Sequence, residues 1–304
     1  MELAIIGLGK MGGNMARRLI KGGHTVIGFN RSSETTKQIA SEIGLIPAIS
    51  IEETVSLLKA PRVVWTMVPS GEATEDTIRV LSGLLSVGDI IIDGGNSNYN
   101  DSVRRAKTLE TLGINFLDAG TSGGIWGLQE GYSMMVGGKE EIVDYLKPVF
   151  DTLAPKKEKG WGYVGPSGAG HFVKMVHNGI EYGLMEAYAE GFELIKAKKE
   201  FNIDLYNVAE IWRYGSVVRS WLLDLISTSL KDDQELSDIR GWVADSGEGR
   251  WTVVEAISSD VPVPIIALSL FQRFISRQDE SYAAKLLSAM RHQFGGHDLK
   301  KVEE

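Results

Sequence analysis

The 304-residue sequence contains no cysteine, which excludes disulfide bonds, a thiolate nucleophile and cysteine-ligated metal. Its five histidines show no HExxH or other paired spacing, so we expect no metal site. No apolar run approaches the ~20 residues of a transmembrane helix, and no basic, cleavable leader precedes the first strand-like run. These absences favour a cytoplasmic protein that does not bind membranes.

Basic residues are fewer than acidic ones, 32 against 40, and the formal net charge is −8. Such a surface repels nucleic acid, so we expect none as a partner, and an anionic small molecule would need a local cluster of cations. The hydrophobic content of 43% is ordinary for a globular protein, and the length predicts two domains.

The first half begins with the pattern of a dinucleotide-binding fold. An apolar strand at residues 3–6 leads into the turn GLGKMG (residues 7–12), a helical pattern at residues 11–21 and a second strand at residues 25–30. The glycines allow a tight turn and let the backbone approach a pyrophosphate at the helix N-terminus. Further strands are expected at residues 63–68, 90–93, 114–119 and 132–136, with a helix at 140–153. The alternation predicts a doubly wound α/β Rossmann-like sheet domain over residues 1–165.

Residues at the end of the second strand distinguish NAD from NADP. An acid there would bind the ribose hydroxyls of NAD, but Asn30, Arg31 and Ser32 stand in its place. Guanidinium, amide and hydroxyl groups suit the 2′-phosphate of NADP, whereas a solvated Arg31 would leave NAD open. We therefore predict NADP, with NAD as the alternative. The cofactor-binding residues that we predict are Gly7, Gly9, Lys10, Met11, Gly12, Asn30, Arg31, Ser32, Met67, Val68 and Asn96.

Two strand-end turns, at Asn96 and at Ser122, are candidates to face substrate and nicotinamide. Ligands of doubly wound sheets bind at the carboxyl ends of the strands. The alternative is simple turn chemistry, because Gly, Asn and Ser are the commonest turn residues.

From residue 169 onward the pattern is helical, which predicts an all-α second domain over residues 166–304. Helices are expected at residues 169–199, 204–214, 217–230, 235–243, 252–259, 263–277 and 281–290. The tail that contains Arg291 and His297 is expected to be poorly helical and to dock on a neighbouring subunit.

One segment, GAGHFVKMVHNGIEYG (residues 168–183), combines an apolar helix with a polar stripe. Helical spacing places five polar side chains on one side of the helix: Lys174, His177, Asn178, Glu181 and Tyr182. The remaining positions are apolar and suit a helix buried on most sides. Burying a lysine and a glutamate carries a desolvation cost that is expected of a catalytic helix. The alternative is a solvated stripe with a chance Lys–Glu pair, and the segment alone does not decide.

This segment resembles the decarboxylating 6-phosphogluconate dehydrogenases, as do IIDGGN (residues 91–96), SGG (residues 122–124), GLGKMG and FNRS (residues 29–32). The resemblance reaches the tail RHQFGGH (residues 291–297) and so covers nearly the whole chain. The length is that of the short bacterial form, which lacks a second helical repeat. The glycine-rich turn and SGG are shared with the wider β-hydroxyacid dehydrogenase superfamily.

The resemblance implies oxidative decarboxylation of 6-phosphogluconate to ribulose 5-phosphate and CO2, with reduction of NADP or NAD. It implies that Lys174 takes the proton of the C3 hydroxyl, that Glu181 protonates the enediol and that Asn178 orients the substrate. It also implies a homodimer or homotetramer whose tail completes a neighbouring site. The implied substrate-binding residues are Asn96, Ser122, Gly123, Gly124, His177, Asn178, Tyr182, Arg273, Arg291 and His297.

The chain departs from the family pattern at several ligand positions. Ser246 and Glu248 stand where the family has a lysine and a threonine near the phosphate, and an added anion there is unfavourable. Ile125 replaces a polar cofactor contact, and Pro69 replaces a lysine near the adenosine end.

Two alternative functions remain at this stage. A β-hydroxyacid dehydrogenase acting on an unphosphorylated acid would share Lys174 but have little use for Arg273. A non-catalytic dinucleotide sensor would need neither Lys174 nor Glu181.

Overall fold

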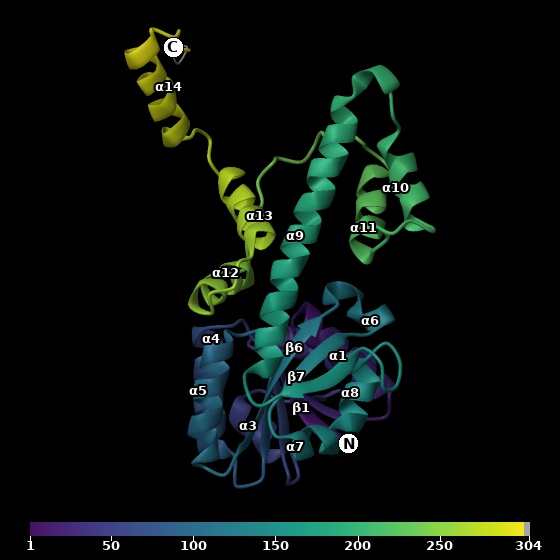
Figure 1. The fold of residues 1–304 in the computed structure, drawn as a ribbon. Coiled ribbons are helices and arrows are strands. Elements are labelled where there is room, and N and C mark those ends of the chain that lie inside the picture. The colour runs from purple at the N-terminus through teal and green to yellow at the C-terminus, as the bar shows by residue number, and fades with distance from the viewer. Residues whose placement is uncertain (301–304) are drawn as a thin grey trace. The chain divides into compact units, whose positions relative to one another are not determined.

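The computed structural model of the chain describes residues 1–300. Its internal contacts divide the chain into two units, Met1–Gly179 and the residues from Ile180 onward. The first unit is built on a sheet of eight strands in the order β3-β2-β1-β4-β5-β6-β7-β8 (Figure 1). The strands are β1 (Glu2–Ile6), β2 (Thr25–Phe29), β3 (Ile46–Pro47), β4 (Val63–Thr66), β5 (Ile90–Asp93), β6 (Asn115–Ser122), β7 (Ser133–Gly137) and β8 (Trp161–Gly165).

Strands β1 to β6 pair in parallel, whereas β7 pairs antiparallel with β6 and parallel with β8. The chain reverses its direction of travel across the sheet between β1 and β4, which makes the carboxyl ends of these strands the switch point where ligands bind. The predicted doubly wound α/β fold is confirmed.

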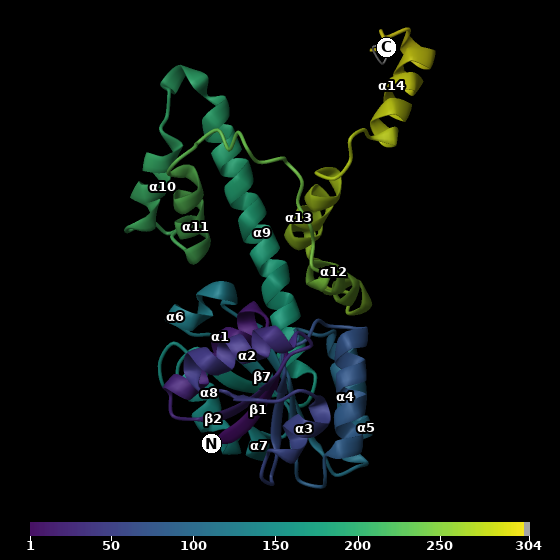
Figure 2. The same ribbon diagram turned by 180° about the vertical axis from the view of Figure 1, so that it is seen from behind.

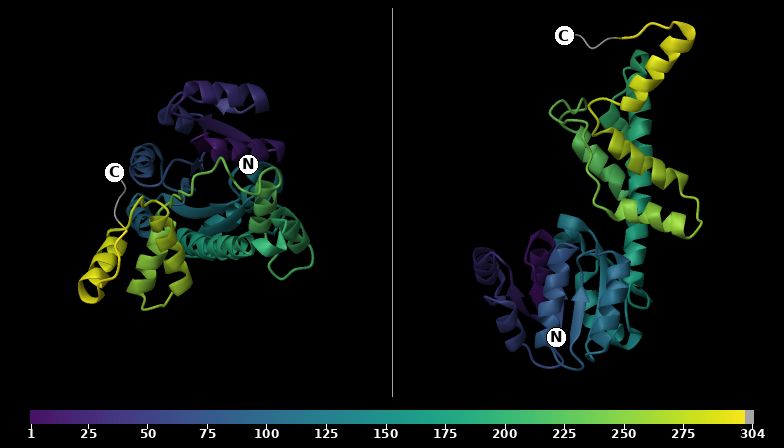
Figure 3. Two further views of the ribbon diagram at one scale, coloured as in Figure 1. Left: turned by 90° about the horizontal axis from the view of Figure 1, so that it is seen from above. Right: turned by 90° about the vertical axis from the view of Figure 1, so that its left-hand side faces the viewer.

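Helices cover both faces of this sheet (Figure 3). Side chains alternate along each strand, so Ile5 packs in one core with Met15 of α1 (Lys10–Lys21), while Ile6 packs in a second core with Ile78 of α4 (Glu72–Leu84). The helices of this unit are α1 (Lys10–Lys21), α2 (Ser33–Ile43), α3 (Ile51–Ser56), α4 (Glu72–Leu84), α5 (Tyr99–Glu110), α6 (Gly127–Glu130), α7 (Glu140–Tyr145) and α8 (Lys147–Leu153).

The single helix predicted for residues 140–153 is wrong, because α7 and α8 are separate helices. Pro148 lies at the start of α8, where its missing N–H is harmless, whereas inside one continuous helix it would remove a hydrogen bond.

The chain beyond β8 is helical, as predicted, apart from its connecting segments. The helices are α9 (Ala169–Ala197), α10 (Leu205–Arg213), α11 (Trp221–Leu230), α12 (Glu248–Ser258), α13 (Pro264–Ile275) and α14 (Tyr282–Gly295). In the second unit, α10 and α11 lie side by side (Figures 1 and 2), and Leu205, Ala209 and Leu223 pack with Phe192 of α9 in a small core. Among residues 1–300, no helix is long and apolar enough to cross a membrane.

Two expectations for this half are corrected. Residues 235–243 form turns instead of a helix. The tail is helical further than expected, since α14 continues through Arg291 to Gly295 and ends where Gly296 adopts a left-handed conformation.

Candidate active site

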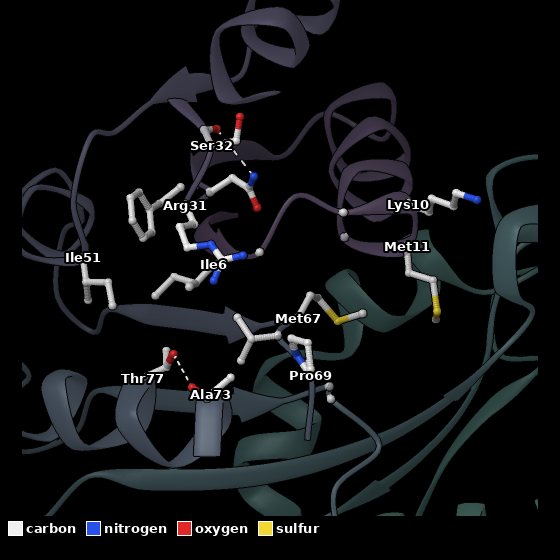
Figure 4. Close-up of a pocket in the computed structure, with 18 of the residues that line it drawn as sticks. Ile6, Lys10, Met11, Arg31, Ser32, Ile51, Met67, Pro69, Ala73 and Thr77 are labelled. Atoms are coloured by element: carbon white, nitrogen blue, oxygen red, sulfur yellow. Dashed lines mark hydrogen bonds between the residues drawn. The ribbon is translucent and has the colours of Figure 1, made fainter. Parts of the chain in front are cut away.

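A cavity of about 750 Å³ lies at the carboxyl ends of β1, β2, β4 and β5 (Figure 4). Every cofactor-binding residue predicted from the sequence lines it: Gly7, Gly9, Lys10, Met11, Gly12, Asn30, Arg31, Ser32, Met67, Val68 and Asn96. Sequence reasoning missed Phe29, Ile51, Ala73 and Thr77, which also line it. Ile51, Ala73 and Thr77 lie together at one end, opposite Lys10 and Met11. These residues lie in the first two turns of α3 and α4. Their position in a helix that follows a strand-end turn is the sequence signal that could have identified them.

The glycine-rich turn has the shape that a pyrophosphate requires. A Cβ at Gly12 would overlap the carbonyl oxygen of Gly7, so the third glycine is needed for close packing of α1 on the turn. A Cβ at Gly9 would meet no heavy atom within 4 Å, so the backbone there borders open space. Gly9 provides no side-chain cap and the first turn of α1 holds no acid, which leaves its N–H groups suited to an anion.

Arg31 and Asn30 have different surroundings at the end of β2. The Asn30 Oδ1 atom accepts a hydrogen bond of 3.1 Å from the Leu8 N–H, so this amide supports the glycine-rich turn. Arg31 is exposed on the cavity, and within residues 1–300 no carboxylate pairs with it. Its guanidinium is therefore a cation for which the described chain provides no counter-charge.

The turns after β5 and β6 are joined through Asn96. The Asn96 Oδ1 atom accepts from the Thr121 N–H at 2.9 Å, and its Nδ2 atom donates to the Thr121 carbonyl at 3.2 Å. Ser122 follows at the end of β6, and Gly123 and Gly124 turn the chain away with φ of 127° and 51°. Two turns far apart in sequence thus meet at the edge of the cavity that Asn96 lines.

Helix α9 starts directly against β6. The Asp118 carboxylate accepts hydrogen bonds from the backbone N–H groups of Gly168, at 2.6 Å, and His171, at 2.8 Å. It therefore caps the helix and complements its dipole. A Cβ at Gly120 would overlap the Cβ of Lys174, so glycine at this strand position lets Lys174 lie directly on β6.

The Lys174 amine is held within its own helix. The side chain is 5% exposed, and its Nζ atom donates to Asn178 Oδ1 at 2.6 Å and lies 3.3 Å from His177 Nδ1. Lys174 packs against Gly120 of β6, and the next residue of this strand, Thr121, is the one that Asn96 binds. Lys174 therefore lies next to the Asn96 turn and to Ser122. The structure thus brings together Asn96, Ser122, Lys174, His177 and Asn178.

The expectation that α9 is buried on most sides is wrong for the described chain. Ile180 and Leu184 are 53% and 49% exposed, whereas Lys174 and Tyr182 are each 5% exposed. Glu181 is half-buried and lies two turns after Lys174 on the same helix. The polar stripe is therefore the more buried side, which disfavours a solvated stripe.

Tyr182 and Arg273 form a separate cluster within the second unit. The Arg273 guanidinium stacks 3.4 Å from the centre of the Tyr182 ring, and its Nη1 atom donates to the Ala244 carbonyl at 2.8 Å. The Tyr182 hydroxyl accepts from the Ser246 N–H at 3.0 Å. A Cβ at Gly249 would contact the Tyr182 ring, so α12 begins directly against it.

Near this cluster, Arg250 forms an ion pair, whereas Glu248 is a buried acid. The Arg250 Nε atom lies 2.5 Å from Asp245, which Arg277 also contacts at 2.8 Å, and hydrogen bonds from both arginines lower the pKa of Asp245. Arg250 is thus assigned to an ion pair. Glu248 is 9% exposed, and within the described chain its Oε2 atom has no hydrogen-bond partner.

Arg291 and His297 are exposed at the end of the described chain. His297 contacts Phe294 edge-on, with 6.1 Å between ring centres, and its carbonyl oxygen lies 2.8 Å from His292 Nδ1. The contacts recorded for His297 are thus with its own tail.

The strand order and the glycine-rich turn at the switch point define an NAD(P)-dependent dehydrogenase fold. Residues 2–165 match the family model described as the NAD binding domain of 6-phosphogluconate dehydrogenase, and residues 170–285 match that of the 6-phosphogluconate dehydrogenase C-terminal domain. The chain therefore belongs to the family of NAD(P)-dependent 6-phosphogluconate dehydrogenases.

Individual relatives agree with this membership. The NAD(+)-dependent, decarboxylating 6-phosphogluconate dehydrogenase of Haloferax volcanii is 43% identical over 305 residues, covering 100% of both chains. The 6-phosphogluconate dehydrogenase of Plasmodium falciparum, solved with NADP+ and with 6-phosphogluconate, is 30% identical with a TM-score of 0.84, covering 100% of this chain and 67% of that one. A 3-hydroxyisobutyrate dehydrogenase of Mycobacterium tuberculosis shares the fold at 22% identity and a TM-score of 0.72, covering 95% and 99%.

Proposed function

We propose that the protein oxidises and decarboxylates 6-phosphogluconate to ribulose 5-phosphate and CO2, with NADP as the electron acceptor. The observation that carries the proposal is the buried Lys174 amine, held by Asn178 beside the Asn96 and Ser122 turns. In this assignment residues 1–165 bind the cofactor, and residues 166–304 provide substrate contacts and oligomerisation.

The glycine-rich turn and Arg31 would hold NADP, which would supply the acceptor for the hydride on C3 of the substrate. The Lys174 amine takes the proton of the C3 hydroxyl in the same step and becomes an ammonium group. The ammonium then donates its proton to the new ketone oxygen as the C1–C2 bond breaks and CO2 leaves. Glu181 protonates the terminal carbon of the enediol while Lys174 removes a hydroxyl proton, which completes the ketose.

Proton transfer requires the sugar acid to be held between these two groups. Asn96 uses only part of its amide on Thr121, so an N–H and a lone pair remain for substrate and nicotinamide. We assign Ser122, Gly123 and Gly124 to the substrate carboxylate and hydroxyls, and His177 with Asn178 to the hydroxyl that reacts. Because Lys174, Asn178 and Glu181 share one helix, their spacing is set by backbone geometry.

We assign the substrate phosphate to the cluster of Tyr182 and Arg273. Arg273 is half-buried, and its guanidinium donates to a carbonyl and to the Met185 sulfur and stacks on the Tyr182 ring. Within residues 1–300, Glu186 acts on it through charge without a salt bridge, so the guanidinium can still bind an anion. In our proposal Arg291 and His297 come from a neighbouring subunit.

The choice of NADP rests on Arg31. A guanidinium that lines the cavity without an acidic partner suits a 2′-phosphate, and the Plasmodium relative was solved with NADP+. The Haloferax relative is named as NAD(+)-dependent, so NAD is the alternative acceptor.

A homo-oligomer is part of the same proposal. Within the described chain α14 has no buried residue, although Tyr282, Leu287 and Phe294 on it are apolar and 78%, 61% and 82% exposed. A helix with this composition is expected to bury an apolar side, and a second copy of the chain would supply the surface. Sedimentation analysis should therefore find a dimer or tetramer, and a monomer at micromolar concentration would contradict this part.

Parallel assays test the proposal. Purified protein is given 6-phosphogluconate, gluconate or 3-hydroxyisobutyrate with NADP or NAD, while reduced cofactor and CO2 are both measured. Reduced cofactor and CO2 in equal amounts from 6-phosphogluconate are expected. Turnover of an unphosphorylated acid alone would show a different β-hydroxyacid dehydrogenase, and cofactor binding without turnover of any acid would favour a sensor.

A further inference from the structure

Arg105 is a buried cation that the proposed chemistry does not use. It lies on α5 and is 3% exposed. Its Nη1 atom contacts Asp93 Oδ2 at 3.2 Å, and its Nε atom donates to Glu75 Oε2 at 3.0 Å. Asp93 is fully buried at the end of β5, so breaking this ion pair would leave an uncompensated charge in the interior.

Asp93 shapes the turn that carries Asn96. Its Oδ1 atom accepts from the Gly95 N–H at 3.0 Å, and its Oδ2 atom accepts from the Ser97 hydroxyl at 2.8 Å. Asn96 lies between these two residues with φ of 50°, in the left-handed region that a non-glycine residue rarely adopts. The bonds to Asp93 therefore hold Asn96 in a conformation that it would otherwise leave, with its amide aimed at Thr121.

The other partner of Arg105 lies on a helix that also borders the cofactor cavity. Glu75 lies on α4 between Ala73 and Thr77, and both of these residues line the cavity. Asn96 lines the same cavity at the end of β5. One guanidinium thus connects α4 to the turn after β5, and its planar fork can bind both carboxylates at fixed angles.

We propose that Arg105 is a positioning residue for the reaction, acting through Asp93 to fix Asn96 against β6. The inference rests on the proposed function, because that function assigns Asn96 to the substrate and the nicotinamide. It adds a residue that touches neither ligand. Lysine cannot replace it, because an ammonium group is a point charge that does not keep both carboxylates in one plane.

The chain offers a matched control one residue away. Arg104 also binds Glu75, through Nη1 at 2.8 Å and Nη2 at 2.7 Å, but its side chain is 52% exposed and has no recorded contact with Asp93. Arg104→Gln removes a cation beside Glu75 and leaves the Asn96 turn intact. Ser97→Ala is a second test variant, because it removes one bond to Asp93 and keeps the buried ion pair.

A double-mutant cycle measures whether Arg105 acts through Asn96. Arg105→Lys is expected to lower kcat/KM for 6-phosphogluconate about tenfold or more, as small displacements of positioning groups do. In an Asn96→Ala background the same change should lower it less than about twofold, because the group being positioned is already absent. Arg104→Gln should leave kcat/KM within about twofold of wild type, as surface changes usually do. Equal losses from Arg105→Lys in both backgrounds would overturn the inference, as would unchanged activity of both Arg105→Lys and Ser97→Ala.

Amide hydrogen exchange separates this inference from the proposed function. Arg105→Lys and Ser97→Ala should speed exchange of the Thr121 N–H, which Asn96 binds, relative to the Leu117 N–H in the same strand. Arg104→Gln should not. Faster Thr121 exchange in a protein inactive on 6-phosphogluconate would support the positioning role while the proposed function fails. Exchange that rises equally at both amides would show general destabilisation and overturn the inference.

Discussion

Lys174 and Gly120 are in such close contact that a Cβ atom on Gly120 would overlap the Cβ of Lys174. The separation of α9 from β6 is therefore set by the absence of a side chain at one strand position. Since Thr121 and Ser122 follow directly, the same contact sets how far the Lys174 amine lies from the Asn96 turn.

We expect Gly120→Ala to displace Lys174 and lower kcat by about 100-fold, the effect of a misplacement of roughly 1 Å. Overpacking of this kind should also lower the free energy of unfolding by about 1–3 kcal/mol. Steady-state kinetics and urea unfolding measure the two effects. Gly191→Ala is the control, because Gly191 lies on α9 with no heavy atom within 4 Å of an added Cβ. It should keep kcat and gain up to ~1 kcal/mol of stability from helix propensity. Wild-type kcat in Gly120→Ala would contradict the close-contact argument.

Lys174→Met should abolish hydride transfer, because the thioether fills similar space but accepts no proton from a hydroxyl at neutral pH. A loss of at least about 10²–10⁴-fold in kcat is expected for a general base. NADP binding, followed by tryptophan fluorescence, should stay near the wild-type value, since Lys174 does not line the cofactor cavity. Substantial residual turnover would remove Lys174 from the base role.

Arg31→Ala should weaken NADP binding about 10- to 100-fold, the size of a lost charge-assisted hydrogen bond of roughly 1.5–3 kcal/mol. NAD binding should change by less than about twofold, because NAD has no 2′-phosphate for the guanidinium to bind. Titration calorimetry with both cofactors checks this, with Arg79→Ala as the control, since Arg79 pairs with Asp76 on an exposed part of α4. An equal loss for both cofactors would show that no 2′-phosphate is bound at Arg31.

Glu75 should make stability depend on pH in the acid range. Hydrogen bonds from Arg104 chiefly, and from Arg105, lower its pKa from 4.5 to about 2. A carboxyl with a depressed pKa stabilises the folded state above its unfolded pKa, and this contribution is lost as the pH falls. Wild type should therefore be more stable than Glu75→Gln by a constant amount above pH 4.5, and this advantage should decrease as the pH falls toward 2. It will be smaller than the full shift implies, because the side chain is 42% exposed and screened by water. A pH-independent difference in urea midpoints would contradict this, and Glu72→Gln, at the exposed start of α4, is the control.

Truncation before Arg291 should raise KM for 6-phosphogluconate and leave NADP binding unchanged, if the tail reaches a neighbouring site. Arg291→Ala with His297→Ala should have the same effect without shortening α14. An unchanged KM in both proteins would show that the tail lies elsewhere.

The parts of the fold that follow from local pattern were predicted well. β5 was expected at residues 90–93 and is found at Ile90–Asp93, because an apolar run between turn residues has few other solutions. The residues predicted to bind the cofactor line a single cavity, because a glycine-rich turn and strand ends meet at one edge of a parallel sheet.

Predictions failed where side chains compete with the backbone. Residues 235–243 have helical composition, but the Asp233 carboxylate accepts hydrogen bonds from the Glu235 and Ser237 N–H groups, and Leu236 has φ of 50°. Such local bonds offer the backbone an alternative to the helix. The contact of Gly120 with Lys174 could not be predicted from the sequence either, because the two residues lie far apart in sequence and no periodicity links them.

Asp118, Gly120 and Ser122 alternate along β6 and therefore point to the same face, where Asp118 caps α9 and Gly120 admits Lys174. A slip of β6 by one residue against its neighbours would turn all three to the opposite face at once. Misfolded molecules of this type would be wholly inactive, so a poorly refolded preparation should lose active-site titre while the kcat of each remaining active molecule stays constant.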